Sequence, residues 1–160
     1  MDIGETIKNN LKNKLVPEIG RLIKHFPYQA NDDLSIILKG HLLIEDLLVR
    51  YVKKKLKNPD KLGNFKFYHF LCLAKALEDK TENNWIWDAC EKLNNIRNKL
   101  AHHLEHTAID NLKKDIITII KKETPEFPKE LITTYGELKL YLTALYIDLA
   151  FELHLDEVLI

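Results

Sequence analysis

The chain has 160 residues, 46% hydrophobic and 30% charged, which is typical of one folded domain and excludes a disordered or disulfide-dense protein. Lysine plus arginine and aspartate plus glutamate both total 24, so no net charge attracts the whole chain to nucleic acid or to an acidic membrane. The first residues do not have the pattern of a signal sequence, and no later segment has the length and apolarity of a membrane span, so we expect a single cytoplasmic domain over 1–160 that does not bind a membrane. Neither Cys72 nor Cys90 lies in a CxxC pair, and we expect both to be reduced and to lie in the core.

The N-terminal part is expected to contain a broken helix followed by a long one. Apolar residues at four-residue spacing over residues 3–15 predict a helix that Pro17 interrupts, and a short second segment continues to Phe26. "FPYQANDD" predicts a loop that ends in an aspartate N-cap, and the pattern from Leu34 to about Leu56 predicts a long amphipathic helix. Its apolar stripe is expected to contain Leu34, Leu38, His41, Glu45, Leu48 and Val52.

The rest of the chain predicts further helices and no strand. "KNPDKLGN" ends the long helix, "FKFYHFLCLAKALED" predicts a third helix, and a fourth begins near Trp85 and runs through "IRNKLAHHLE". Thr107 with Asp110 resembles a capping box that starts a fifth helix, and one or two more follow from about Lys129, with Gly136 as a weak point. Since no segment alternates with the period of a strand for long, we predict an all-α fold, an up-and-down bundle of five or six helices.

The fourth helix carries a group of polar residues beside its core face. Its core stripe is expected to comprise Ala89, Leu93, Ile96, Leu100 and Leu104. Arg97 lies at one edge of this stripe, His103 lies near the other edge, and His102 lies about 180° from Leu93. Arg97 and the histidines therefore do not share one face. To act on one phosphate they need a helix that ends or kinks near Ala101, or a second copy of the chain.

His41 and Glu45 interrupt the apolar stripe of the long helix, one turn apart. Both are expected to point inward, where a carboxylate is costly unless a cation or hydrogen-bond donors accompany it. Arg97 is the candidate partner of Glu45. This pairing is either purely structural or holds the guanidinium in place for a substrate phosphate.

"RNKLAHH" resembles the motif of HEPN domains, which are small all-α domains. That motif is an arginine, commonly followed by a polar residue such as asparagine, then four to six residues and a histidine; Arg97, Asn98 and His102 match it with four residues between, and His103 fits with five. "GHLLIEDLLVRYV" resembles the second helix of the mannitol-repressor-like branch, where an acidic residue interrupts an apolar run. The resemblance is strongest over 30–122, and residues 128–160 form a C-terminal extension.

The resemblance implies a metal-independent endoribonuclease of toxin or phage-defence type that acts as a homodimer on RNA and leaves 2′,3′-cyclic phosphate ends. By this resemblance Arg97 binds the phosphate, His102 transfers protons, Asn98 assists, and His103 replaces or assists His102. No cofactor is implied. Leu104 stands where HEPN toxins with nucleotidyltransferase antitoxins have a tyrosine, so that partner is not expected, although another antitoxin or a regulatory protein is compatible. The alternative is a non-catalytic HEPN module, a dimeric regulatory or protein-interaction domain.

Three other groups of residues have both a functional and an ordinary interpretation. Lys53, Lys54, Lys55 and Lys57 lie in the basic segment 50–66 and are candidates for RNA binding, although lysines at a helix end usually form a solvated terminus. Aromatic residues in "FKFYHF" are able to stack on bases, but at helical spacing Phe67 and Phe70 are expected in the core. His102 and His106 have the spacing of zinc ligands on a helix, but the usual ligand set is absent, so no metal is expected; His69 stands alone as an ordinary surface or half-buried residue.

Overall fold

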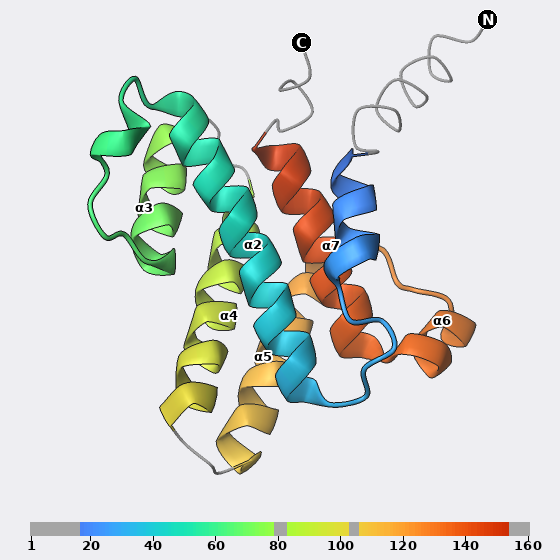
Figure 1. Ribbon diagram of the computed structural model, residues 1–160. Helices are drawn as coiled ribbons and strands as arrows, with labels where there is room; N and C mark the ends of the chain where they lie inside the picture. Colours follow the sequence, from blue (N-terminus) through green and yellow to red (C-terminus); the bar gives the residue numbers. More distant parts are fainter. Residues whose placement is uncertain (1–16, 79–82, 103–105, 154–160) are drawn as a thin grey trace, which may run out of the picture.

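The computed structural model describes residues 17–78, 83–102 and 106–153, and within these ranges the chain is helical and contains no strand. The prediction of an all-α bundle is confirmed. After a helical segment over 17–25, the elements are α2 (Asp33–Lys55), the short 3₁₀ helix η1 (Pro59–Lys61), α3 (Phe67–Leu77), α4 (Asn84–His102), α5 (His106–Glu123), α6 (Lys129–Tyr135) and α7 (Glu137–Glu152) (Figure 1). The helix expected over residues 3–15 lies outside the described residues.

The long helix α2 lies at the centre of the bundle and packs against α3, α4 and α7, while α5 packs against α4 and α7 (Figure 1). Apolar side chains from all of these helices form one contiguous core, which includes the fully buried Leu47, Leu93, Ile116 and Leu145. None of the described helices is both long and apolar enough to cross a membrane. One core thus holds α2, α3, α4, α5 and α7 together.

The two ends of α2 carry the residues that stabilise helix ends. The Asp32 side chain accepts a hydrogen bond of 2.9 Å from the backbone N–H of Ser35, so the expected aspartate N-cap is confirmed. Three lysines occupy the last turn, where they complement the negative end of the helix dipole.

The buried face of α2 differs from the expected stripe. Leu34 and Leu38 are 49% and 37% exposed, whereas Ile37 and Leu47 are fully buried. Because α2 is covered by helices on several sides, its buried face is wider than one stripe and is centred on other residues. The expectation was therefore wrong for Leu34 and Leu38 and right for Leu48 and Val52, which are fully buried.

Of three further expectations about the helices, two are confirmed and one is wrong. In α4 the stripe residues Ala89, Leu93 and Ile96 are fully buried, as expected. Gly136 adopts φ +81° and separates α6 from α7, so the predicted weak point is confirmed as a break. By contrast, Thr107 lies inside α5, which begins at His106, so the expected capping box does not start that helix.

The two cysteines have different environments, and the expectation that both lie in the core was wrong for one of them. Cys90 is fully buried, and burial raises the pKa of its thiol. Cys72, in contrast, is exposed on α3. Its helix packs on only one side, so the apolar neighbours of Cys72 in the sequence do not bring its own side chain into the core.

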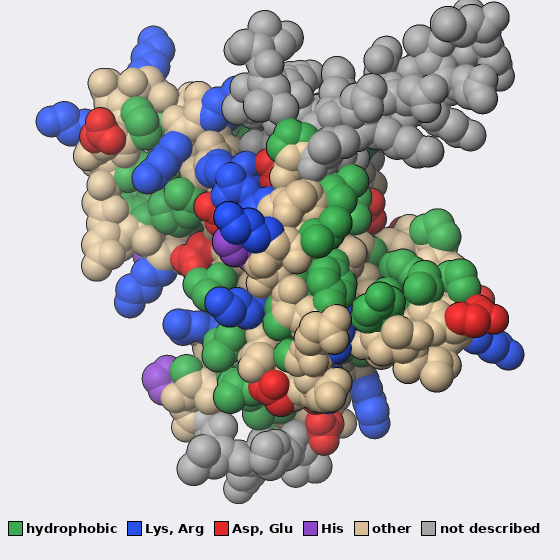
Figure 2. Space-filling model, turned by 45° about the vertical axis from the view of Figure 1, so that its right-hand side comes forward, with side chains coloured by type: hydrophobic (Ala, Val, Ile, Leu, Met, Phe, Trp, Pro, Cys, Tyr) green, Lys and Arg blue, Asp and Glu red, His purple; other side chains and the backbone are tan. Residues whose placement is uncertain are grey.

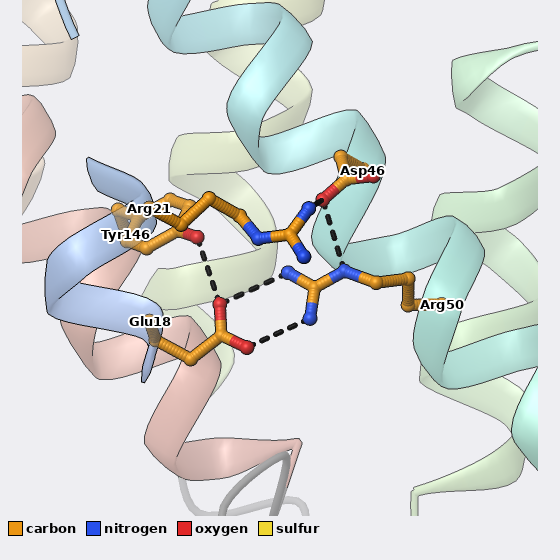
Figure 3. Close-up of polar contacts among 5 residues, drawn as sticks. All are labelled: Glu18, Arg21, Asp46, Arg50 and Tyr146. Carbon is orange, nitrogen blue, oxygen red and sulfur yellow. Dashed lines mark hydrogen bonds and ion pairs between the residues drawn. The ribbon is translucent and has the colours of Figure 1, made fainter. Parts of the chain in front are cut away.

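A partly buried ionic network fastens the segment over 17–25 to the bundle. The Arg50 guanidinium donates two hydrogen bonds to the Glu18 carboxylate, at 2.7 and 2.9 Å, and Tyr146 Oη donates a third at 2.9 Å (Figure 3). Arg50 and Arg21 also each donate at 2.9 Å to Asp46. The network joins three elements that are distant in the sequence: the segment over 17–25, α2 and α7 (Figure 3).

Candidate functional site

A surface pocket of about 610 Å³ lies where α2, α4 and the start of α3 meet, within the usual size range of ligand sites. Helix α2 contributes Leu38, His41, Leu42 and Glu45, and α4 contributes Asn94, Arg97 and Asn98. The loop before α3 and the first turn of that helix contribute residues 65–69. The pocket therefore brings Arg97 and Asn98, from the "RNKLAHH" segment of α4, next to His41 and Glu45 of α2.

Arg97 has hydrogen-bonding capacity that the fold does not use. Its side chain is exposed, and Nη1 donates to Asn98 Oδ1 at 3.3 Å. No carboxylate among the described residues lies within 4.0 Å of the guanidinium, so the expected ion pair with Glu45 is not formed. The positive charge of Arg97 still acts on Glu45 through space, because it opposes the rise of that carboxyl group's pKa. Most of the guanidinium donors remain available to an anionic ligand.

His41 is fixed inside the pocket wall. It is 4% exposed, its ring stacks on Phe67 with centroids 4.3 Å apart, and its Nε2 lies 3.2 Å from Asn94 Oδ1. Burial lowers the pKa of His41; the hydrogen bond that His41 donates to Asn94 opposes this shift, and the charge of Arg97 adds to it. Because an amide oxygen only accepts hydrogen bonds, neutral His41 carries its proton on Nε2 and presents an unprotonated Nδ1 to Glu45.

Glu45 is the acidic group of the pocket. Its side chain is 30% exposed, and its Oε2 lies 4.0 Å from His41 Nδ1. Burial raises the pKa of its carboxyl group, partly opposed by the charge of Arg97. Glu45 therefore lies at the pocket wall between water and the core, rather than fully inward as expected, and it is more readily protonated than an ordinary glutamate.

The histidines of the motif are not at the pocket. His102 is the exposed last residue of α4 and is not among the lining residues, and His103 lies outside the described residues. Five positions along a straight helix rotate a side chain by roughly 140°, which places His102 on another side of α4 from Arg97. The structure thus brings Arg97 and Asn98 together with Glu45 and His41, and it does not bring His102 to them within one chain.

The lysines proposed to bind RNA are also away from the pocket. Lys53, Lys54 and Lys55, in the last turn of α2, and Lys57 just beyond it are all exposed, and none lines the pocket. Lys55 Nζ lies 5.5 Å from the centroid of the Tyr51 ring, a cation–π contact. On the face that Figure 2 shows, basic side chains are interspersed with acidic and apolar ones.

Three polar lining residues were not singled out from the sequence as pocket residues. Asn94 precedes Arg97 by one turn on α4, so the helical wheel carried a signal for it. Lys66 and His69 lie at the start of α3, where the backbone N–H of Lys66 donates to His69 Nδ1 at 2.9 Å. Nothing in the sequence indicated that the start of α3 faces α4.

No group of three or more histidine, cysteine or acidic side chains within the described ranges has an arrangement able to hold a metal ion. Comparison with protein-family models, with curated proteins and with solved structures found no match to this chain.

Proposed function

We propose that this protein is a metal-independent endoribonuclease whose phosphate-binding group is Arg97. The observation that carries the proposal is that an arginine with free donors opens onto a pocket that also holds Asn98, Glu45 and His41. Arg97 forms no ion pair with a carboxylate among the described residues, so its charge and most of its donors are available to a phosphate.

The reaction requires one phosphate-binding group and proton transfer at two oxygens. The ribose 2′-oxygen attacks phosphorus and loses its proton to a base, and the 5′-oxygen leaves with a proton from an acid, so the products are a 2′,3′-cyclic phosphate and a 5′-hydroxyl. Arg97 stabilises the charge that develops on the phosphate oxygens, and Asn98 orients the guanidinium. His102 is the proton-transfer group that the HEPN resemblance indicates. Because it lies on another side of α4, we propose that it acts on a phosphate bound by Arg97 of a second copy.

The first experiment incubates labelled RNA with the purified wild type, Arg97→Ala and His102→Ala in EDTA and maps the fragment ends. We expect cleavage by the wild type alone, with 2′,3′-cyclic phosphate ends. Lys99→Ala is the matched control, because Lys99 is exposed on the same helix and does not line the pocket. Intact RNA with folded wild type, or cleavage that EDTA abolishes, would refute the proposal. In cells, expression should arrest growth, and Arg97→Ala should relieve the arrest.

Mixing the two inactive variants tests whether the site is shared between copies. A dimer of Arg97→Ala with His102→Ala retains one site with an intact arginine from one copy and an intact histidine from the other. We therefore expect the mixture to regain part of the wild-type cleavage rate. A mixture as inactive as its components, in a sample shown to exchange subunits, would contradict a shared site.

The second candidate function is a non-catalytic dimeric module that regulates a partner protein. Leu34, Leu38 and Leu42 favour it: they are 49%, 37% and 55% exposed and recur every four residues along α2. Such an apolar row in contact with water is typical of a protein-binding surface. This function predicts intact RNA in every reaction and an association that Leu34→Glu weakens, measured by light scattering.

A further inference from the structure

The pocket has an apolar half that phosphate binding alone does not require. Leu38 and Leu42 border it from α2, Phe65 borders it from the loop before α3, and Tyr68 borders it from the first turn of α3. Phe65 and Tyr68 are 37% and 54% exposed, although both are large and apolar. Single exposed apolar residues are ordinary, but these four converge on the pocket that contains Arg97. A ligand that matches the whole pocket has an apolar part beside an anionic one.

The Phe65 ring is held by two neighbouring rings. The Phe65 ring meets Phe70 edge-on, with centroids 5.9 Å apart, and its centroid lies 5.2 Å from that of His69. Phe70 is 7% exposed and belongs to the core, so contacts with Phe70 and His69 hold the Phe65 ring while 37% of the residue remains exposed. An anchored ring loses little conformational freedom when a flat ligand stacks on it.

Polar groups at the same end of the pocket suit a nucleotide. The backbone N–H of Lys66 donates to His69 Nδ1, so neutral His69 carries its proton on Nε2 and has that donor available. Lys66 and Arg97 place two positive charges at the pocket, against the single carboxylate of Glu45. The combination of stacking surface, hydrogen-bond donor and net positive charge is the one that binds single-stranded nucleic acid.

We propose that the pocket binds one unpaired nucleotide of a single strand, with its base stacked on Tyr68 and Phe65 and its phosphate held by Arg97 and Lys66. The proposal rests on the proposed function and names its substrate as single-stranded RNA. A base within a duplex is covered on both faces by its neighbours, so double-stranded RNA does not offer this surface. Tyr68 thus binds the base and lies outside the "RNKLAHH" segment.

The test measures binding without cleavage. A labelled single-stranded oligonucleotide with 2′-O-methyl groups lacks the attacking hydroxyl, and fluorescence anisotropy reports its affinity for the full chain. The comparison ligands are the same strand in a duplex and an abasic strand with equal phosphate number. Loss of one stacked base weakens binding by roughly fivefold or more. We expect Tyr68→Ala to produce this loss for the single strand and to leave the abasic strand unchanged, and Arg97→Ala to weaken both.

Two controls separate stacking from folding. Tyr68→Trp retains an aromatic ring and should retain affinity. Phe151→Ala removes a ring of similar exposure, 47%, from α7 outside the pocket. Unchanged single-strand affinity in Tyr68→Ala, or equal affinity for the abasic strand, overturns the inference and leaves proposed cleavage intact. Tyr68-dependent binding without cleavage of unmodified RNA supports the inference and refutes cleavage. Folded wild type that binds no oligonucleotide overturns both, and a protein partner then becomes the expected occupant.

Discussion

Removal of Arg50 should destabilise the fold far more than removal of its neighbour Arg21, although both arginines belong to one network (Figure 3). Arg50→Ala takes two hydrogen bonds from Glu18, which is 7% exposed, and leaves the carboxylate with Tyr146 as its donor. Breaking a buried ion pair from one side costs about 3 to 5 kcal/mol. The Arg50 side chain is 29% exposed, so water reaches part of the site, and we expect the lower end, about 3 kcal/mol.

Thermal and urea unfolding followed by circular dichroism measure this loss at pH 7. For a chain of this size, a loss of about 3 kcal/mol lowers the Tm by roughly 6 to 12 °C. Arg21→Ala is the matched control, because Arg21 makes one contact, to Asp46, and the two side chains are 42% and 41% exposed. We expect it to cost less than about 0.5 kcal/mol. Equal losses in the two variants would refute the distinction between buried and exposed partners on which the prediction depends.

The pH dependence gives a second check on the same pair. Burial opposes ionisation of Glu18, but the hydrogen bonds from Arg50 and Tyr146 and the charge of Arg50 outweigh it, so the pKa of Glu18 is lowered from 4.5. The stability that this pair contributes is therefore fully present above pH 4.5 and is lost as the pH falls through the lower folded-state pKa. The difference between wild type and Arg50→Ala should narrow below pH 4.5. A difference that stays constant to pH 3 would contradict the role of the Glu18 charge.

Three further predictions test the pocket, the α6–α7 break and the core. Burial raises the pKa of Glu45 above 4.5, so the ionised carboxylate opposes folding at a pH above that pKa. Glu45→Gln should therefore keep or slightly raise the Tm at pH 7. A sharp fall in the Tm would show instead that Glu45 forms a structural ion pair. Gly136→Ala should lower the free energy of unfolding in urea by about 1 to 3 kcal/mol, because φ is +81° and ψ is 155°, a conformation that L-residues rarely adopt, while no atom lies within 4 Å of the added Cβ; an unchanged midpoint would contradict this backbone conformation. In native protein a thiol reagent should modify Cys72 and spare Cys90 until the chain unfolds, whereas equal rates would contradict the burial of Cys90.

Much of the fold was predictable because helices are specified by local patterns. The apolar spacing of α4, the cap at Asp32 and the break at Gly136 each depend on residues within a few positions of one another. The helical wheel also separated Arg97 from His102 without any tertiary information, because the rotation per residue is constant along a helix.

Tertiary packing decided the rest. Ile37 is buried and Leu38 is exposed because α3, α4 and α7 surround α2, and the spacing within α2 carries no record of where its neighbours lie. The pocket has the same origin: Arg97 and Tyr68 come from different helices, and their meeting depends on how α3 folds back against α2 and α4. Local periodicity determines which segments are helices and which residues share a face. Only the simultaneous burial of all the apolar faces determines which of those faces meet and which polar groups remain open to a ligand.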